Sequence, residues 1–147
     1  MKGNVLFPGS FDPFTRGHAD IVGRALKMFG SVLIAVGHNE QKAGGRTPVA
    51  ERVDTIRRLY ADEPRITVES YTGLTVDFAR ERSISVIIRG VRTVSDFDFE
   101  MQLADVNRQL TGIETILIPA SPQFASLSSS VVRELKHFGH DISSFLP

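Results

Sequence analysis

The sequence alternates short apolar runs with amphipathic stretches five times in succession, and this alternation restricts the fold more than any other feature. Each apolar run is bounded by glycine, proline or polar residues, which is typical of a buried strand. The predicted strands are residues 5–7, 32–36, 66–68, 86–88 and 115–118. After each of them, apolar residues recur at helical spacing, around residues 21–29, 49–60, 76–82, 99–110 and 128–137.

Strands that are apolar on both faces, each followed by a helix, predict a parallel sheet covered on both sides. With right-handed crossovers, the fold is a doubly wound five-stranded parallel sheet, a Rossmann-like α/β architecture. Because no repeat or linker interrupts the pattern, we expect residues 1–147 to form a single domain.

Two of the predicted helices carry local signals. Thr47 and Pro48 are predicted as the N-cap and first residue of a helix. Val131, Val132 and Leu135 are predicted to face inward from the last helix.

The composition excludes several classes of function. Seventeen basic residues balance seventeen acidic ones, which argues against a general nucleic-acid binder. The chain has no cysteine, so disulfides, thiolate metal sites and thiol nucleophiles are excluded. No run approaches the ~18 apolar residues of a membrane span, and the first apolar run is too short for a signal peptide. We therefore expect a soluble cytoplasmic protein with no membrane or nucleic-acid partner.

Ligands of an open parallel sheet bind beyond the carboxyl ends of its strands, so the residues that follow each strand are candidates. After the first strand, Ser10 and Phe11 offer backbone N–H groups and a hydroxyl. Gly17 and His18 then open a helix, whose N-terminus is a ready anion site. A lone histidine in this place is more often an incidental cap residue, but the neighbouring segment 9–13 (GSFDP) favours a functional histidine.

Basic side chains follow two further strands. Lys42 lies in a glycine-rich loop after the second strand, and spacing alone favours a solvated surface lysine there. Arg89 and Arg92 flank Gly90 after the fourth strand, and guanidinium groups match phosphate oxygens geometrically. Glu100 on the next helix either pairs with these arginines, accepts from a ribose hydroxyl, or is a helix-face carboxylate.

Three serines, Ser128, Ser129 and Ser130, stand at the start of the last helix. One of them is predicted to be the N-cap. Three hydroxyls exceed what capping requires, so the pattern favours a second anion site at this helix end. Two anion-binding helix ends, two arginines, a histidine and a lysine at one edge of the sheet suit a polyphosphate substrate.

The same residues carry a family resemblance. Residues 9–13 with 15–18 (TRGH) resemble the T/HxGH motif of the nucleotidyltransferase superfamily, and residues 127–133 (LSSSVVR) resemble its ISSTxxR motif. The chain is most similar to the bacterial phosphopantetheine adenylyltransferases, and the resemblance extends over essentially the whole sequence. The further matching segments are residues 20–22, 51–53, 78–80, 88–90, 96–97, 100–104, 107–108 and 145–147.

The resemblance implies transfer of an adenylyl group from ATP to 4′-phosphopantetheine, giving dephospho-coenzyme A and pyrophosphate. It implies that His18 stabilises the transition state at the α-phosphate. It assigns ATP binding to Ser10, Phe11, His18, Gly90, Val91, Arg92, Glu100, Phe124, Ala125, Ser126, Leu127, Ser128, Ser129 and Ser130. It assigns phosphopantetheine binding to Ser10, Lys42, Thr75 and Arg89, with Leu74 close by. It also implies Mg²⁺, feedback by coenzyme A and a homohexamer.

The implied reaction explains why the sequence offers no carboxylate pair and no Ser–His–Asp set. An acceptor phosphate is already ionised at pH 7, so it can attack the α-phosphorus directly and in line, without a general base. Mg²⁺ is expected to bind mainly through ATP phosphates and water. No residue is predicted as a metal ligand, and His137 and His140, three apart near a helix end, are not expected to form a metal site.

The chain departs from the family pattern in a few places, and two other functions remain as alternatives. Ser10 stands where threonine is usual and keeps the hydroxyl, Phe124 stands where a larger aromatic is common, and Gly44, Gly45 and Arg46 replace a more apolar stretch. One alternative is a nucleotidyltransferase for another small phosphate acceptor; the Arg89–Gly90 and Glu100–Gln102 segments favour pantetheine. The other is a nucleotide-sensing module without turnover, which would need neither the histidine nor a second anion site.

Overall fold

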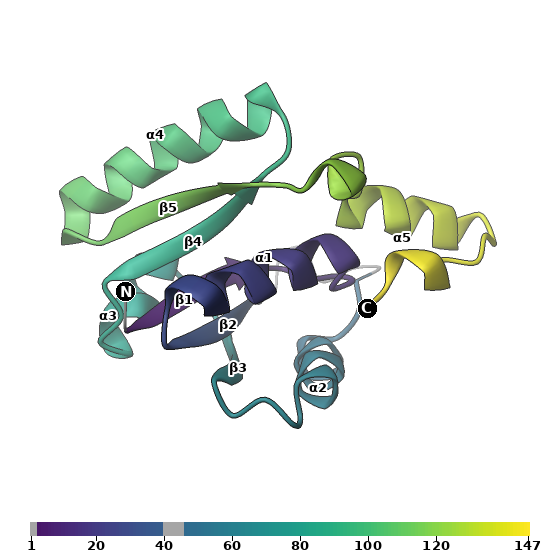
Figure 1. Cartoon of the computed structure of the whole chain (residues 1–147), viewed down its shortest axis with the longest axis horizontal. Helices are drawn as coiled ribbons and strands as arrows, with labels where there is room; N and C mark the ends of the chain where they lie inside the picture. The colour runs from purple at the N-terminus through teal and green to yellow at the C-terminus, as the bar shows by residue number, and fades with distance from the viewer. Residues whose placement is uncertain (1–2, 40–45) are drawn as a thin grey trace.

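The computed structural model describes residues 3–39 and 46–147 and shows a five-stranded parallel sheet flanked by helices (Figure 1). The strands are β1 (Asn4–Gly9), β2 (Ser31–Gly37), β3 (Ile66–Tyr71), β4 (Val86–Val91) and β5 (Glu114–Pro119), in the order β3-β2-β1-β4-β5. The helices are α1 (Arg16–Met28), α2 (Val49–Leu59), α3 (Thr75–Glu81), α4 (Val94–Thr111) and α5 (Ser129–His137). Two 3₁₀ turns, Pro122–Phe124 and Ser143–Phe145, follow β5 and α5. The doubly wound fold predicted from the sequence is confirmed.

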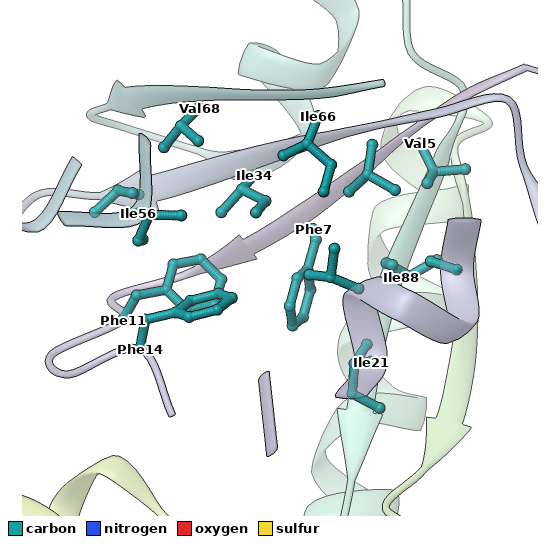
Figure 2. Packing of buried hydrophobic residues seen from close by; sticks show 14 of the residues in the cluster. Val5, Phe7, Phe11, Phe14, Ile21, Ile34, Ile56, Ile66, Val68 and Ile88 are labelled. Carbon is teal, nitrogen blue, oxygen red and sulfur yellow. The ribbon is translucent and has the colours of Figure 1, made fainter. Parts of the chain in front are cut away.

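The two faces of the sheet build separate apolar clusters, because successive side chains of a strand point to opposite sides. Val5 and Phe7 of β1 lie in the larger cluster, whereas Leu6 between them lies in the smaller one. The larger cluster includes residues of α1 and α2, and Figure 2 shows Phe11 and Phe14 extending it beyond the end of β1. The smaller cluster receives Val76 and Phe78 of α3. Helices therefore cover both faces of the sheet.

The strand order places a switch point between β1 and β4. The chain runs outward from β1 through β2 to β3, and from β4 to β5 in the opposite direction. The ladder between β1 and β4 has one pair of partners, Leu6 and Ile87. Pro8 follows, and because proline has no N–H it removes a donor from β1 near its carboxyl end. The two strands therefore leave room for side chains at the carboxyl edge of the sheet.

Helix α4 differs from the other helices in what it exposes. It lies along β5 at the margin of the molecule (Figure 1). Its buried residue is Glu100, whereas seven of its large apolar side chains are exposed: Val94, Phe97, Phe99, Met101, Leu103, Val106 and Leu110. Among the described residues, none of the helices combines the length and the hydropathy needed to cross a bilayer.

Several local predictions are wrong, including the end of β3, which runs to Tyr71 instead of residue 68. The helix after residue 46 begins at Val49, with Pro48 rather than Thr47 as its N-cap and no side-chain capping bond. Strand β4 continues to Val91, because Arg89, Gly90 and Val91 pair with Leu117, Ile118 and Pro119 of β5. Val131 is 46% exposed, whereas Val132 is fully buried, so the last helix packs through a narrower face than expected.

Candidate active site

A cavity of about 440 Å³ lies at the carboxyl ends of β1 and β4. Its lining includes the first residues of two helices, Gly17 and His18 of α1 and Ser128 to Ser130 at the start of α5. Four arginines also line it: Arg46, Arg89, Arg92 and Arg133. Helix N-termini carry unsatisfied N–H groups and partial positive charge. The cavity therefore gathers donors and positive charge from segments far apart in the sequence.

The ring of His18 is held by the residue that caps its own helix. Thr15 is the N-cap of α1, and its backbone N–H donates to Nδ1 of His18 at 2.9 Å. The Thr15 hydroxyl lies 3.2 Å from the same nitrogen and accepts from the His18 backbone N–H at 3.4 Å. A backbone amide can only donate, so Nδ1 is an acceptor and a neutral ring carries its proton on Nε2. Nε2–H is the donor left for a ligand in the cavity.

Phenylalanine side chains pack around the His18 ring. The ring of Phe11 meets it edge-on with centroids 5.0 Å apart, and Phe14 lies at 5.3 Å. Phe11 has a φ of 48°, a conformation that is uncommon for a bulky residue. Gly9 permits this arrangement, because a Cβ at that position would lie 2.9 Å from the Phe11 ring. Apolar packing on one side and Thr15 on the other thus fix the imidazole.

This environment keeps His18 uncharged. Burial, together with the positive charges of Arg89 and Arg92, lowers the pKa of His18 from 6.5 to about 4. At pH 7 the imidazole is therefore neutral. With Nδ1 occupied and Nε2 protonated, the ring has no free lone pair with which to accept a proton. Its geometry suits a fixed hydrogen-bond donor and not a general base.

Arg89 is held at the base of the cavity by a buried carboxylate. Its Nε and Nη2 donate to the two carboxylate oxygens of Glu100 at 3.0 and 2.8 Å. Its Nη1 donates to the carbonyl of Pro8 at 2.7 Å, across the point where β1 and β4 separate. Glu100 is 6% exposed. A bidentate pair of this kind fixes the plane of the guanidinium as well as its position.

The partners of the other three arginines of the cavity differ from the bidentate carboxylate that holds Arg89. The Arg92 guanidinium lies 3.6 Å from the Asp96 carboxylate. Arg46 lies 4.0 Å from the carboxylate of Asp12, and Arg133 donates to the Asp12 carbonyl at 2.7 Å. In the part of the chain that the structure describes, these carboxylates lie outside the cavity lining. The lining therefore keeps a strongly positive character that suits a polyanion.

The three serines at the start of α5 line the cavity, and the hydroxyl of each also forms a hydrogen bond within the protein. Ser128 is the N-cap and accepts from the Val131 N–H at 3.2 Å, which confirms that one serine caps the helix. Ser129 donates to the carbonyl of Pro13 at 2.8 Å. The Ser130 hydroxyl accepts from Arg133 at 3.2 Å. The Ser129 bond attaches the start of α5 to the β1–α1 loop and so helps to hold the two helix N-termini at one cavity.

Comparison with known proteins identifies the family. The cytidylyltransferase-like family model matches residues 6–135. A phosphopantetheine adenylyltransferase of Porphyromonas gingivalis is 51% identical over 150 residues, covering 100% of this chain and 96% of that protein. Phosphopantetheine adenylyltransferases of Phocaeicola vulgatus and Streptomyces coelicolor are 50% and 46% identical, and each alignment covers 97% of this chain, with 94% and 89% of the relatives. The chain belongs to the phosphopantetheine adenylyltransferase family.

A solved structure supports the fold of this family member. A bifunctional NMN adenylyltransferase/ADP ribose pyrophosphatase from Francisella tularensis superposes with a TM-score of 0.75. The match covers 99% of this chain but 45% of that one, at 15% identity. At this identity the likeness concerns the fold alone: the same doubly wound sheet is present within a longer protein.

Most of the residues predicted for the site lie together. Those that line the cavity are Ser10, Phe11, His18, Arg89, Gly90, Arg92, Phe124, Leu127, Ser128, Ser129 and Ser130. Val91, Ala125 and Ser126 adjoin them without lining it. Glu100 lies beneath the lining and binds Arg89, so of the three possibilities open from its spacing the structure shows the ion pair.

Two of the residues predicted to bind phosphopantetheine lie elsewhere. Thr75 begins α3 at the same edge of the sheet, but outside the cavity lining, and its hydroxyl is 2.7 Å from the hydroxyl of Tyr71. The neighbouring Leu74 is exposed. Lys42 lies outside the described residues. The structure brings Ser10 and Arg89 together at one cavity, and the phosphopantetheine-binding roles of Ser10, Lys42, Thr75 and Arg89 stay predictions.

Two arginines of the lining were not predicted. Arg133 follows Ser129 by one helical turn, so its spacing placed it on the same helix end, and that signal was available in the sequence. Arg46 follows a glycine-rich loop, and no periodicity or motif distinguishes it. The sequence indicates that Thr15 is part of a motif, but its bond to Nδ1 of His18 is visible only in three dimensions.

Proposed function

We propose that this chain transfers the adenylyl group of ATP to 4′-phosphopantetheine, releasing pyrophosphate and forming dephospho-coenzyme A. The observation that carries the proposal is His18, a neutral imidazole whose Nε2–H is available to a cavity lined by four arginines and two helix N-termini. The family of its relatives, which are named for this reaction, supports the same substrates. The reaction belongs to coenzyme A biosynthesis.

The reaction requires the site to position the two substrates and to stabilise the negative charge that grows on the α-phosphate. The acceptor phosphate attacks the α-phosphorus in line, the bond to the leaving pyrophosphate breaks, and no covalent enzyme intermediate forms. His18 donates from Nε2 to an α-phosphate oxygen, where negative charge grows in the transition state. A neutral donor is suitable, because it remains protonated on Nε2 at any pH well above its own pKa of about 4.

The residues divide between the two substrates. We assign ATP to the β4 and α5 side, where Gly90, Val91, Arg92 and residues 124–130 meet Ser10, Phe11 and His18. We assign the acceptor phosphate to Ser10 and Arg89, with Thr75 and Lys42 toward its pantetheine arm. Because both of its oxygens accept from Arg89, Glu100 acts through that arginine and so on the side of the acceptor phosphate.

The donor set fits a magnesium ion carried by the substrate. The described lining offers hydroxyls and guanidinium groups but no carboxylate, and the described residues contain no cluster of His, Cys, Asp and Glu that could hold a metal. We propose that Mg²⁺ binds through ATP phosphates and water and neutralises charge on the leaving pyrophosphate.

Three further properties are proposed from the family resemblance. The exposed apolar residues of α4 support association of copies, for which we propose a homohexamer. Coenzyme A carries both a pantetheine arm and an adenine nucleotide, so we propose that it acts as a feedback ligand at this cavity. We propose a cytoplasmic location, where ATP and the acceptor are both present.

The test is pyrophosphate release by the purified protein with ATP, Mg²⁺ and 4′-phosphopantetheine. His18→Ala is expected to lower turnover by about a hundredfold or more, as for loss of one oxyanion-hole donor, while ATP binding falls less. Near-normal turnover in His18→Ala would refute the role of His18. Release with nicotinamide mononucleotide or glycerol phosphate but not with phosphopantetheine would keep the mechanism and replace the substrate. ATP binding without release from any acceptor would indicate a sensing module.

A further inference from the structure

Arg52 is a buried arginine whose hydrogen bonds go to main-chain carbonyls. It lies on α2 and is 9% exposed. Its Nη1 donates to the carbonyls of Ser10 at 2.6 Å and Gly37 at 3.2 Å, and its Nε donates to the carbonyl of Thr47 at 2.9 Å. A buried charge is costly unless it is well hydrogen-bonded, so these contacts are what keep the side chain in place.

The three carbonyls belong to three segments that end at the same edge of the sheet. Ser10 follows β1, Gly37 is the last residue of β2, and Thr47 precedes α2. Carbonyls at the ends of strands and before a helix are not fully paired by regular secondary structure, and buried ones need another donor. An apolar side chain could fill this space but could not satisfy them. By donating to all three carbonyls, the guanidinium of Arg52 holds the end of β1, the end of β2 and the start of α2 at fixed distances from one another.

This joint forms part of the wall of a second cavity, of about 600 Å³, at the end of β2. Arg52, Gly37 and Thr47 line it, and it shares Ser10 and Arg46 with the cavity of His18. In-line transfer requires the attacking and leaving groups on opposite sides of the α-phosphorus. With ATP assigned to the β4 and α5 side, the acceptor phosphate approaches from the side of this second cavity.

We propose that Arg52 is a positioning residue for the acceptor: by holding the Ser10 carbonyl, it aims the Ser10 hydroxyl and N–H at the incoming phosphate. The inference rests on the proposed adenylyl transfer. Arg52 acts through the main chain of Ser10 and does not itself need to touch the substrate. Loss of the guanidinium hydrogen bonds therefore weakens acceptor binding more than ATP binding.

The experiment compares Arg52→Lys and Arg52→Ala with Arg57→Ala. Arg57 is a matched control, because it lies on the same helix and also donates twice to one main-chain carbonyl, that of Val68 at 2.7 and 3.1 Å, away from both cavities. Lysine keeps the positive charge of Arg52, but its single ammonium group cannot donate to the three carbonyls as the guanidinium does. For each variant, KM for phosphopantetheine, KM for ATP, kcat and the thermal midpoint are measured, and Arg52→Ala is also assayed with added methylguanidinium.

In Arg52→Lys we expect KM for phosphopantetheine to rise by about tenfold or more, the usual effect of losing hydrogen bonds to a charged group, with KM for ATP nearly unchanged. Methylguanidinium should lower the acceptor KM of Arg52→Ala and have no effect on Arg57→Ala. Equal rises in both KM values, or changes in Arg52→Lys no larger than in Arg57→Ala, would overturn the inference; if Arg52→Ala does not fold, Arg52→Lys decides. A wild-type protein that releases no pyrophosphate with phosphopantetheine would instead overturn the proposed function.

Discussion

At the scale of single residues, the role of His18 is decided by which of its nitrogens is occupied. The Thr15 N–H uses Nδ1, and this leaves one donor and no acceptor facing the cavity. A histidine intended as a base would need the opposite tautomer. The apolar rings of Phe11 and Phe14 pack against His18 and also disfavour the charged form of its imidazole. Tautomer and charge thus point to the same use, stabilisation of charge on a phosphate.

The titration of His18 follows from this environment. Because the folded pKa is about 4 and the unfolded value is 6.5, only the unfolded chain binds a proton to this residue between those values. The free energy of unfolding should therefore fall as the pH is lowered from about 7 toward 4. NMR of imidazole-labelled protein, with the His18 signals assigned by their absence in His18→Ala, should show Nε2 protonated and no titration above pH 5. A His18 midpoint near 6.5 would contradict the account.

At the scale of the elements, the site depends on the contact between β4 and α4. Arg89 of β4 and Glu100 of α4 form the bidentate pair, and the third bond of Arg89 reaches β1. Removing one member of such a pair leaves the other charge without its partner. The pair is therefore expected to hold three elements together as well as to orient Arg89.

Glu100→Gln should show this in its stability. We expect the free energy of unfolding to fall by about 1–3 kcal/mol, in the lower part of that range because the Arg89 side chain is 31% exposed. Asp54→Asn is the control, because the Asp54–Arg58 pair on α2 is 65% and 69% exposed and should contribute less than about 1 kcal/mol. Urea unfolding followed by circular dichroism, at one protein concentration, gives both values. Equal losses would show that Glu100 adds no more than a surface pair.

The sequence predicted the elements better than their ends. Apolar runs such as residues 32–36 mark strands because burial on both faces leaves no polar position. The end of β4 depends on pairing with β5, which no local pattern records, so Arg89 was placed after the strand. In the site, the sequence predicts His18 and Ser128 as cavity residues because anion-binding helix ends have local signals. Arg46 and Arg52 were not assigned a role, because their partners are main-chain or distant groups.

At the scale of the whole molecule, the feature that the single chain does not explain is α4. Four of its exposed apolar residues, Phe99, Leu103, Val106 and Leu110, follow one another at spacings of four, three and four and so lie along one stripe. Soluble monomers rarely expose contiguous apolar patches of this kind, which usually mark an interface. The same helix presents Glu100 to Arg89, so a partner on the stripe would also steady the site.

Leu103→Glu should therefore dissociate the assembly that we propose. A charge buried against apolar side chains of another copy has no partner and is strongly disfavoured, whereas in a monomer Leu103 is already 40% exposed and the change should cost little. Sedimentation or light scattering should show a multiple of the 16.2 kDa chain mass for the unmodified protein and a smaller species for Leu103→Glu. Phe138→Glu, at an exposed residue outside the stripe, should leave the mass unchanged. If the wild-type protein sediments at the mass of one chain, α4 is not an interface between copies. If Leu103→Glu keeps the mass of the full assembly, the interface lies elsewhere.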